Sequence, residues 1–184
     1  MNKILIIDIE TTGFLQKGGK IVEVGLVELN LSNGDRTIVF DQVTHEKGIT
    51  REDVEGSWIV ENSTLTVEDV RTSRRLDKLK PEIQDIIYFY ESGITAFNNA
   101  FDFGFMENRG FVLPNKLACP MKLSTPLCQL PKQWGGGYKW PTVEEAYAFF
   151  FGETDYVEAH RGADDAFHEA EIVYELYKRK IFKI

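Results

Sequence analysis

The sequence contains no long apolar run. Its N-terminal apolar stretch extends only from Ile4 to Ile7 and ends at Asp8, which does not fit a secretory signal peptide. No other stretch approaches the ~20 apolar residues that a membrane-spanning helix requires. We therefore expect no membrane partner and a cytoplasmic location.

Cysteine is also scarce. The two cysteines, Cys119 and Cys128, have a spacing that fits no common zinc site. In a protein without a secretion signal, we interpret both as reduced and structurally incidental thiols.

The chain also lacks an excess of positive charge. It has 21 Lys and Arg residues and 29 Asp and Glu residues, which gives a net charge of −8. Proteins that coat nucleic acid without regard to sequence rely on a basic surface, so this class is disfavoured. An enzyme is not excluded. A site for divalent metal ions needs clustered carboxylates, and the ions return positive charge where phosphate binds.

The length and composition are those of an ordinary globular protein. Of the 184 residues, 43% are hydrophobic and 27% are charged. This length is enough for one compact domain and short for two. No internal repeat, low-complexity tract or long linker divides the chain. We therefore predict a single domain over residues 1–184.

Three strands are predicted to open the chain. Lys3–Glu10, Ile21–Leu31 and Thr37–Phe40 are apolar runs, and Asn33-Gly34 before the third run is a strong hairpin signal. A polar segment, Asp41 to Arg75, follows. Further elements are predicted from the spacing of apolar residues, from proline residues where helices can begin and from glycine residues where helices can end. These are a helix from Pro81 to Gly93, a strand over Ile94–Phe97, a helix over Phe101–Asn108, a strand over Leu117–Met121, a helix over Pro141–Phe151 and a last helix from about Ala163.

This order of elements predicts an α/β fold with a mixed sheet. The opening hairpin is antiparallel, and the strands that follow crossover connections are parallel.

Asp8 and Glu10 are the first candidate functional residues. They lie two positions apart on a predicted strand, so their side chains share a face. Two like charges at the end of a buried strand are costly unless something such as a divalent metal neutralises them. The alternative is that both lie past the strand end, in water.

Two further candidate groups lie later in the chain. Asp102 follows Phe101 at the start of a short predicted helix, where a helix N-cap is the alternative role. His160 and Asp165 would point ~140° apart on one ideal helix. They can face one site only if His160 lies on a loop before the helix, which Gly162 permits. The alternatives are a surface histidine and an acidic first helical turn, the role we give to Asp164.

Together and in this order, these groups resemble the DEDDh family of 3′→5′ exonucleases. The first family motif matches Asp8-Ile9-Glu10-Thr11-Thr12-Gly13, the second matches Asn98-Asn99-Ala100-Phe101-Asp102, and the third matches His160 through Asp165. Lys20–Gly25 is similar to the family's second strand, and Tyr138–Tyr147 is similar to the segment before its third motif. The resemblance covers nearly the whole chain.

The resemblance implies a fold, a reaction and a cofactor. The fold is ribonuclease H-like, a five-stranded mixed sheet with three antiparallel strands first, flanked by helices. The reaction is hydrolysis of DNA or RNA from a single-stranded 3′ end, which releases nucleoside 5′-monophosphates. Asp8, Glu10, Asp102 and Asp165 would bind two Mg²⁺ (or Mn²⁺) ions, for which carboxylate oxygen is suited. His160 would act as the general base.

The resemblance also implies substrate-binding residues. Thr11, Thr12 and Gly13 would hold the terminal nucleotide, with a simple turn as the alternative. Asn98 would orient the second motif through side-chain hydrogen bonds. Arg161 is expected either to touch a phosphate or to be solvated.

Two other segments are candidates for contact with nucleic acid. Trp134 and Trp140 flank Gly135-Gly136-Gly137, where a lid that stacks on bases is one hypothesis. A basic cluster between Arg71 and Lys80 can follow a phosphate backbone or form a solvated helix face.

Rival functions remain at this point. One is a catalytically silent binding module, which would lack at least one of the five motif residues; all five are present. Others are a ribonuclease H-like endonuclease and a small-molecule phosphodiesterase. A stable polymerase tether is not expected, because no segment follows the last predicted helix. The sequence does not choose between DNA and RNA, or between a monomer and a homodimer.

Overall fold

The computed structural model describes residues 2–152 and 156–184 and has a five-stranded mixed sheet at its centre. Its strand order is β4-β3-β2-β1-β5. The strands are β1 (Lys3–Thr11), β2 (Ile21–Asn30), β3 (Arg36–His45), β4 (Arg74–Arg75) and β5 (Ile94–Thr95). The first three are antiparallel, whereas β5 runs parallel to β1 and β4 runs parallel to β3. The mixed sheet with three antiparallel strands first is thus confirmed.

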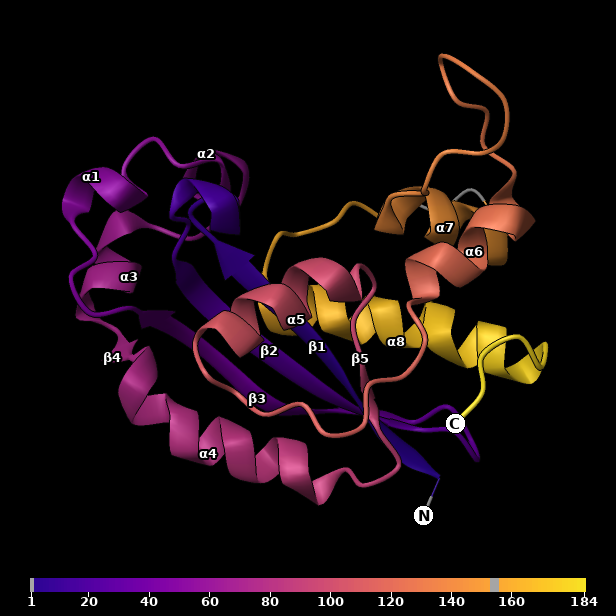
Figure 1. The fold of residues 1–184 in the computed structure, drawn as a ribbon, viewed down its shortest axis with the longest axis horizontal. Coiled ribbons are helices and arrows are strands. Elements are labelled where there is room, and N and C mark those ends of the chain that lie inside the picture. Colours follow the sequence, from indigo (N-terminus) through magenta and orange to yellow (C-terminus); the bar gives the residue numbers. More distant parts are fainter. Residues whose placement is uncertain (1, 153–155) are drawn as a thin grey trace.

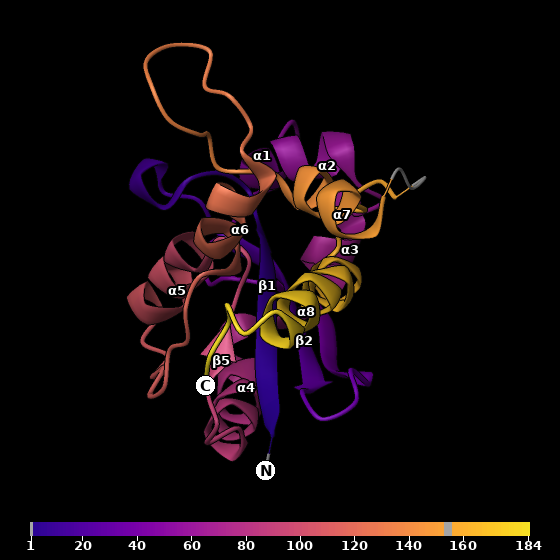
Figure 2. The ribbon, with the colours of Figure 1, turned by 90° about the vertical axis from the view of Figure 1, so that its right-hand side faces the viewer.

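Helices cover both faces of this sheet (Figures 1 and 2). The long helices are α4 (Leu76–Phe89), α5 (Asn99–Asn108), α6 (Pro120–Cys128), α7 (Val143–Phe151) and α8 (Gly162–Lys178). Along β1, Leu5 and Ile7 join a core with α4 and α5, while Ile4 and Ile6 join a core with α6, α7 and α8. Because its side chains alternate between two buried layers, β1 has to be apolar on both faces.

The polar segment after β3 forms three short helices, α1 (Arg51–Val54), α2 (Trp58–Asn62) and α3 (Val67–Thr72). Thr50 and Thr66 begin α1 and α3 with capping boxes, in which each hydroxyl and an aspartate three residues later satisfy two backbone amides. Their few apolar residues form a third small core with Val22. This packing places Trp58 in the lining of the same cleft as Thr11, the last residue of β1.

Two predicted elements differ from the structure, and one observed strand was not predicted. The strand predicted over Leu117–Met121 is wrong: Pro120 begins α6, and only Lys116 makes a single bridge to β5. The fifth strand is instead β4, within the polar segment. Helix α4 begins at Leu76, five residues before Pro81, because Leu76 and Leu79 are buried and extend its apolar face. Their burial outweighs the backbone hydrogen bond that proline cannot donate.

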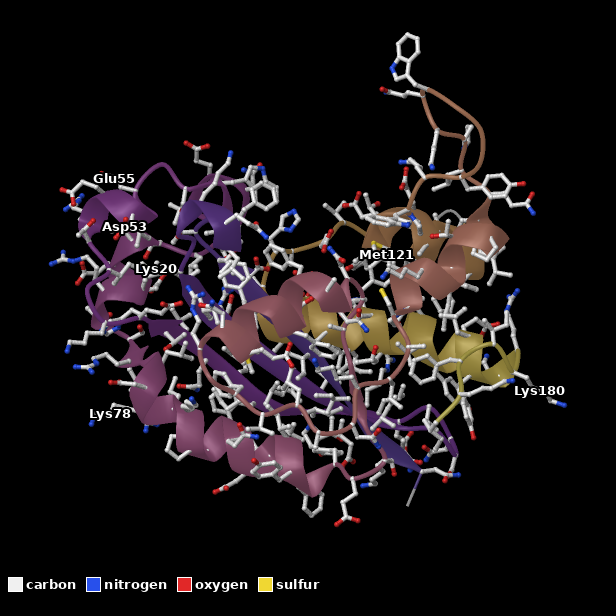
Figure 3. The ribbon with its side chains drawn as sticks, in the orientation of Figure 1. Lys20, Asp53, Glu55, Lys78, Met121 and Lys180 are labelled. Carbon is white, nitrogen blue, oxygen red and sulfur yellow. The ribbon has the colours of Figure 1, made fainter. Side chains whose placement is uncertain are left out.

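The basic cluster is divided among α3, β4 and α4. Its three arginines pair with acidic side chains: Arg71 with Glu68, Arg74 with Glu82, and Arg75 with Asp77. Lys78 extends outward into solvent, as Glu55 and Lys180 do elsewhere on the surface (Figure 3). This arrangement favours the interpretation as a solvated surface.

Among the described residues, none of the helices combines the length and apolar character needed to cross a bilayer.

Candidate functional site

The candidate site lies at the carboxyl end of β1. Asp8 and Glu10 project from one face of this strand, while Ile9 between them is buried on the other. In β2, Gly25 lies opposite Asp8 and Glu23 lies opposite Glu10. The two carboxylates thus lie within the paired part of the strand, and the alternative of a position past the strand end is wrong.

A close backbone contact brings the start of α8 to the same place. A Cβ atom on Gly25 would lie 2.1 Å from the carbonyl carbon of Gly162, the first residue of α8. A Cβ atom on Gly162 would lie 3.2 Å from the carbonyl oxygen of Asp8. Glycine at both positions lets helix and strands touch, so that the third motif meets the first.

Asp102 comes from α5 and is 4% exposed. One of its carboxylate oxygens accepts the backbone N–H of Ile9 at 3.3 Å, between Asp8 and Glu10. Asn98, not Asp102, is the N-cap residue of α5. The N-cap alternative for Asp102 is therefore wrong, and its carboxylate belongs to the cluster on β1.

Asp165 lies on α8, and His160 lies on the loop before it, as the spacing required. The two carboxylate oxygens of Asp165 accept the backbone N–H groups of Ala159 at 3.1 Å and Arg161 at 2.8 Å. The amides on either side of His160 are thereby fixed. Potential ligand atoms of Glu10, His160 and Asp165 lie within 4.8 Å of one another.

Arg161 stabilises this loop. Its guanidinium donates to both oxygens of the fully buried Glu23, at 3.0 and 2.8 Å, and to the Thr64 hydroxyl at 2.9 Å. Arg161 is therefore bound to Glu23 and Thr64 rather than freely solvated, and its contact with a phosphate stays a prediction.

The predicted substrate-binding residues differ in whether they line the cleft. Thr11, Gly13 and Asn98 line the cleft. The hydroxyl of Thr11 donates to the carbonyl of Gly13 at 3.0 Å, whereas the hydroxyl of Thr12 accepts the N–H of Lys20 at 3.0 Å and holds the turn. Asn98 is exposed and makes no side-chain cap to α5. Their contacts with a nucleotide stay predictions.

These groups surround a cleft of about 480 Å³, a volume in the range of small-ligand sites. Four aromatic side chains also line it: Phe14, Trp58, Phe97 and Phe101. The ring of Trp58 packs edge-on against the ring of His160, with 4.6 Å between the centroids.

Trp58, Glu158 and Glu169 are among the cleft residues that sequence reasoning missed. Glu169 lies four positions after Asp165, a spacing that places both on one face of a helix and that could have identified it. No local pattern marks Trp58 or Glu158.

The cleft is strongly acidic, and burial is the main reason that the pKa values of its carboxyl groups are raised. Burial and the charges of neighbouring carboxylates raise the pKa of Asp8 well above its usual value and that of Glu10 to about 9. Burial also raises the pKa of Asp102 to about 7 and that of Asp165 to about 6. Burial lowers the pKa of His160.

Comparison with known proteins decides the family. A family model described as an exonuclease, RNase T, matches residues 5–173. The chain belongs to this exonuclease family. The resemblance to the DEDDh enzymes is confirmed, and the prediction of an exonuclease is confirmed at the level of the family.

One curated relative of this RNase T family member is the PolC-type DNA polymerase III of Clostridium perfringens (strain 13 / Type A). It is 26% identical over 181 residues, which are 95% of this chain and 11% of the polymerase. The chain thus spans only a small part of that protein.

Solved structures of other nucleases share the fold. The nuclease domain of 3′hExo, a DEDDh family member bound to rAMP, has a TM-score of 0.69 at 14% identity, over 100% of this chain and 96% of that one. Cell-death related nuclease 4 (CRN-4) has a TM-score of 0.69 at 14% identity, over 97% and 64%. E. coli exonuclease I with a dA16 oligonucleotide has a TM-score of 0.64 at 13% identity, over 98% and 42%. The ribonuclease H-like fold is thereby confirmed.

Proposed function

We propose that this protein is a metal-dependent 3′→5′ exonuclease that hydrolyses DNA or RNA from a single-stranded 3′ end and releases nucleoside 5′-monophosphates. One observation carries the proposal. Asp102 lies over the backbone between Asp8 and Glu10, and Asp165 fixes the loop that holds His160 beside Glu10. Four of the five motif residues line one cleft, and potential ligand atoms of the fifth, Asp165, lie within 4.8 Å of those of Glu10 and His160.

The donor set fits divalent metal ions. Asp8, Glu10, Asp102 and Asp165 offer oxygen atoms, which Mg²⁺ and Mn²⁺ prefer, and no basic side chain among the described residues forms an ion pair with any of these four. Clustered carboxylates in a buried setting need positive charge from elsewhere. Two such ions supply activation of a water molecule and stabilisation of the leaving oxygen.

His160 is suited to accept the proton of that water. Its lowered pKa keeps the imidazole neutral at pH 7, and a neutral imidazole has a free nitrogen acceptor. The ring of Trp58 and the two amides held by Asp165 restrict where His160 can lie.

The end of the cleft beyond Glu10 is suited to the terminal nucleoside. Thr11 and Gly13 provide polar backbone and hydroxyl groups there, and Phe14 and Phe101 provide apolar rings. Aromatic rings stack on bases of any sequence when these are unpaired. A single-stranded 3′ end therefore matches this cleft better than a duplex end does.

The test is hydrolysis of matched 5′-labelled single-stranded DNA and RNA with Mg²⁺ or with EDTA. We expect a ladder that shortens by one nucleotide at a time from the 3′ end, absent with EDTA and absent in Asp8→Asn. Initial products from internal cuts would indicate an endonuclease instead. No cleavage of either substrate with Mg²⁺ or Mn²⁺ would favour a binding module.

A further inference from the structure

Glu169 is a buried acidic residue in the cleft that the three motifs do not include. It lies on α8, is 3% exposed, and lines the cleft together with Asp8 and Asp102. Helix α8 crosses the sheet directly over β1 and β2 (Figures 1 and 2). The side chain of Glu169 therefore enters the site from the same helix as Asp165, one turn farther on.

The contacts of Glu169 leave its charge unbalanced. One carboxylate oxygen accepts the backbone N–H of Phe97, just after β5, at 3.2 Å. No basic side chain in the described part of the chain forms an ion pair with Glu169. Arg161, at the start of the same helix, has its guanidinium bound to Glu23. A buried carboxylate with a single amide partner is costly unless a cation approaches it.

The neighbours of Glu169 show where that cation would lie. Among the surrounding charges, Glu169 is the one that most raises the pKa of Asp8, after burial. Burial and, next, the charge of Asp102 raise the pKa of Glu169 itself. Such mutual effects between carboxyl groups arise at short range. The geometry agrees with this placement. Glu169 is held by the N–H of Phe97 just after β5, the strand that pairs with β1, and Asp102 is held by the N–H of Ile9 in β1. Potential ligand atoms of His160 and Asp165 instead lie close to those of Glu10.

We propose that Glu169 is a fifth carboxylate of the metal site, which strengthens binding of the divalent ion held between Asp8 and Asp102. This inference rests on the proposed function for the presence of the ions. It adds a third carboxylate beside Asp8 and Asp102, with which Glu169 lines the cleft.

The variant Glu169→Gln separates charge from packing. Glutamine has the same shape and keeps an oxygen that can accept the Phe97 N–H, so only the negative charge is lost. In EDTA at neutral pH we expect a higher melting temperature than in the wild type, because the wild-type carboxyl must either keep a proton or bury its charge on folding, and the neutral amide does neither. With Mn²⁺ we expect a smaller rise in melting temperature, and titration calorimetry should show one of two Mn²⁺ sites weakened by roughly 10-fold or more.

The control is Glu175→Gln, the same substitution on the same helix at a carboxylate that pairs with Lys178 and Arg179 away from the cleft. Its Mn²⁺ affinities should equal those of the wild type. Glu169→Asp, which keeps the charge, should retain more affinity at the weakened site than Glu169→Gln does.

Two results would overturn the inference. One is equal Mn²⁺ binding by the wild type and Glu169→Gln. The other is a lower melting temperature of Glu169→Gln in EDTA with an unchanged response to Mn²⁺, which would assign Glu169 to packing alone. A wild-type protein that binds no Mn²⁺ would instead contradict the proposed function.

Discussion

The position of His160 depends on several neighbours, because its backbone is strained. Its φ of +52° lies in the left-handed region, which residues other than glycine rarely adopt. Asp165 fixes the amides on either side, Arg161 is bound to Glu23, and Trp58 packs against the ring. These contacts hold the imidazole at the cleft, where a base is needed.

We expect His160→Ala to lower turnover by roughly 10²-fold or more and to leave metal affinity largely intact. Alanine removes the proton acceptor, while the carboxylates remain. Single-turnover hydrolysis of labelled single-stranded DNA and calorimetric titration with Mn²⁺ measure the two effects. His45→Ala, on β3 and outside the cleft lining, is the control. Unchanged turnover would exclude His160 as the base, and a large loss of Mn²⁺ affinity would make it a metal ligand.

At the scale of elements, β1, β2 and most of the long helices were predictable, whereas β4, α6 and the short helices α1 to α3 were not. β1 and β2 have apolar runs long enough to show a pattern, whereas β4 has two residues and depends on Thr44, whose hydroxyl donates to the carbonyl of Arg74 at 2.8 Å. In the apolar segment from Leu117 to Met121 the last three residues are buried, but burial alone does not separate a strand from the start of a helix.

The residues of the candidate site also divide into predictable and unpredictable ones. Asp8, Glu10, Asp102 and Asp165 were identifiable because each belongs to a motif that is local in sequence. Trp58 was not, because its contact with His160 joins two segments that are far apart in the chain and depends on how α2 packs.

The loop between α6 and α7 is the element with the most exposed aromatic surface. It projects beyond the rest of the molecule (Figure 1), and Trp134 on it is 88% exposed, with Trp140 and Tyr138 also exposed. Its base is held by a hydrogen bond from the N–H of Lys139 to the carbonyl of Leu130 at 2.9 Å. Val143, directly after the loop, lines the cleft.

Because the loop joins the cleft wall, we predict that Trp134 stacks on bases upstream of the hydrolysed end. Trp134→Ala should weaken binding of a long single strand by roughly 5-fold or more, the effect of losing about one stacked base. Hydrolysis of a dinucleotide should not change. Tyr88→Ala, an exposed aromatic on α4, is the control. Equal affinity of Trp134→Ala and wild type for the long strand would remove this role.

For the whole molecule, the clustered carboxylates oppose folding when no metal is bound. Their pKa values are raised in the folded state, so the folded protein keeps protons that the unfolded chain releases. The unfolded chain then binds fewer protons, and the free energy of unfolding falls as pH rises. The affected pH range extends from about 4, the ordinary pKa of a carboxyl group, to about 9, the pKa of Glu10.

We therefore expect stability in EDTA to decline between pH 5 and pH 9, through the values of about 6 for Asp165 and about 7 for Asp102. Carboxylates with lowered pKa, such as Glu28, act below this range. The lowered pKa of His160 opposes the decline, but only as pH rises to about 6.5, its ordinary value. The six cleft carboxyl groups with raised pKa values, those of Asp8, Glu10, Asp102, Glu158, Asp165 and Glu169, outweigh one imidazole.

Magnesium should reverse this trend, because it binds the deprotonated carboxylates of the folded state. At a free concentration of 100 times Kd, one bound ion adds about 2.7 kcal/mol to the free energy of unfolding. Urea unfolding at pH 5, 7 and 9, in EDTA and in Mg²⁺, measures both effects. Asp8→Asn should be more stable than the wild type in EDTA at pH 9 and should gain less from Mg²⁺. Stability in EDTA that rises from pH 5 to pH 9 would contradict the burial of unpaired charge in the cleft.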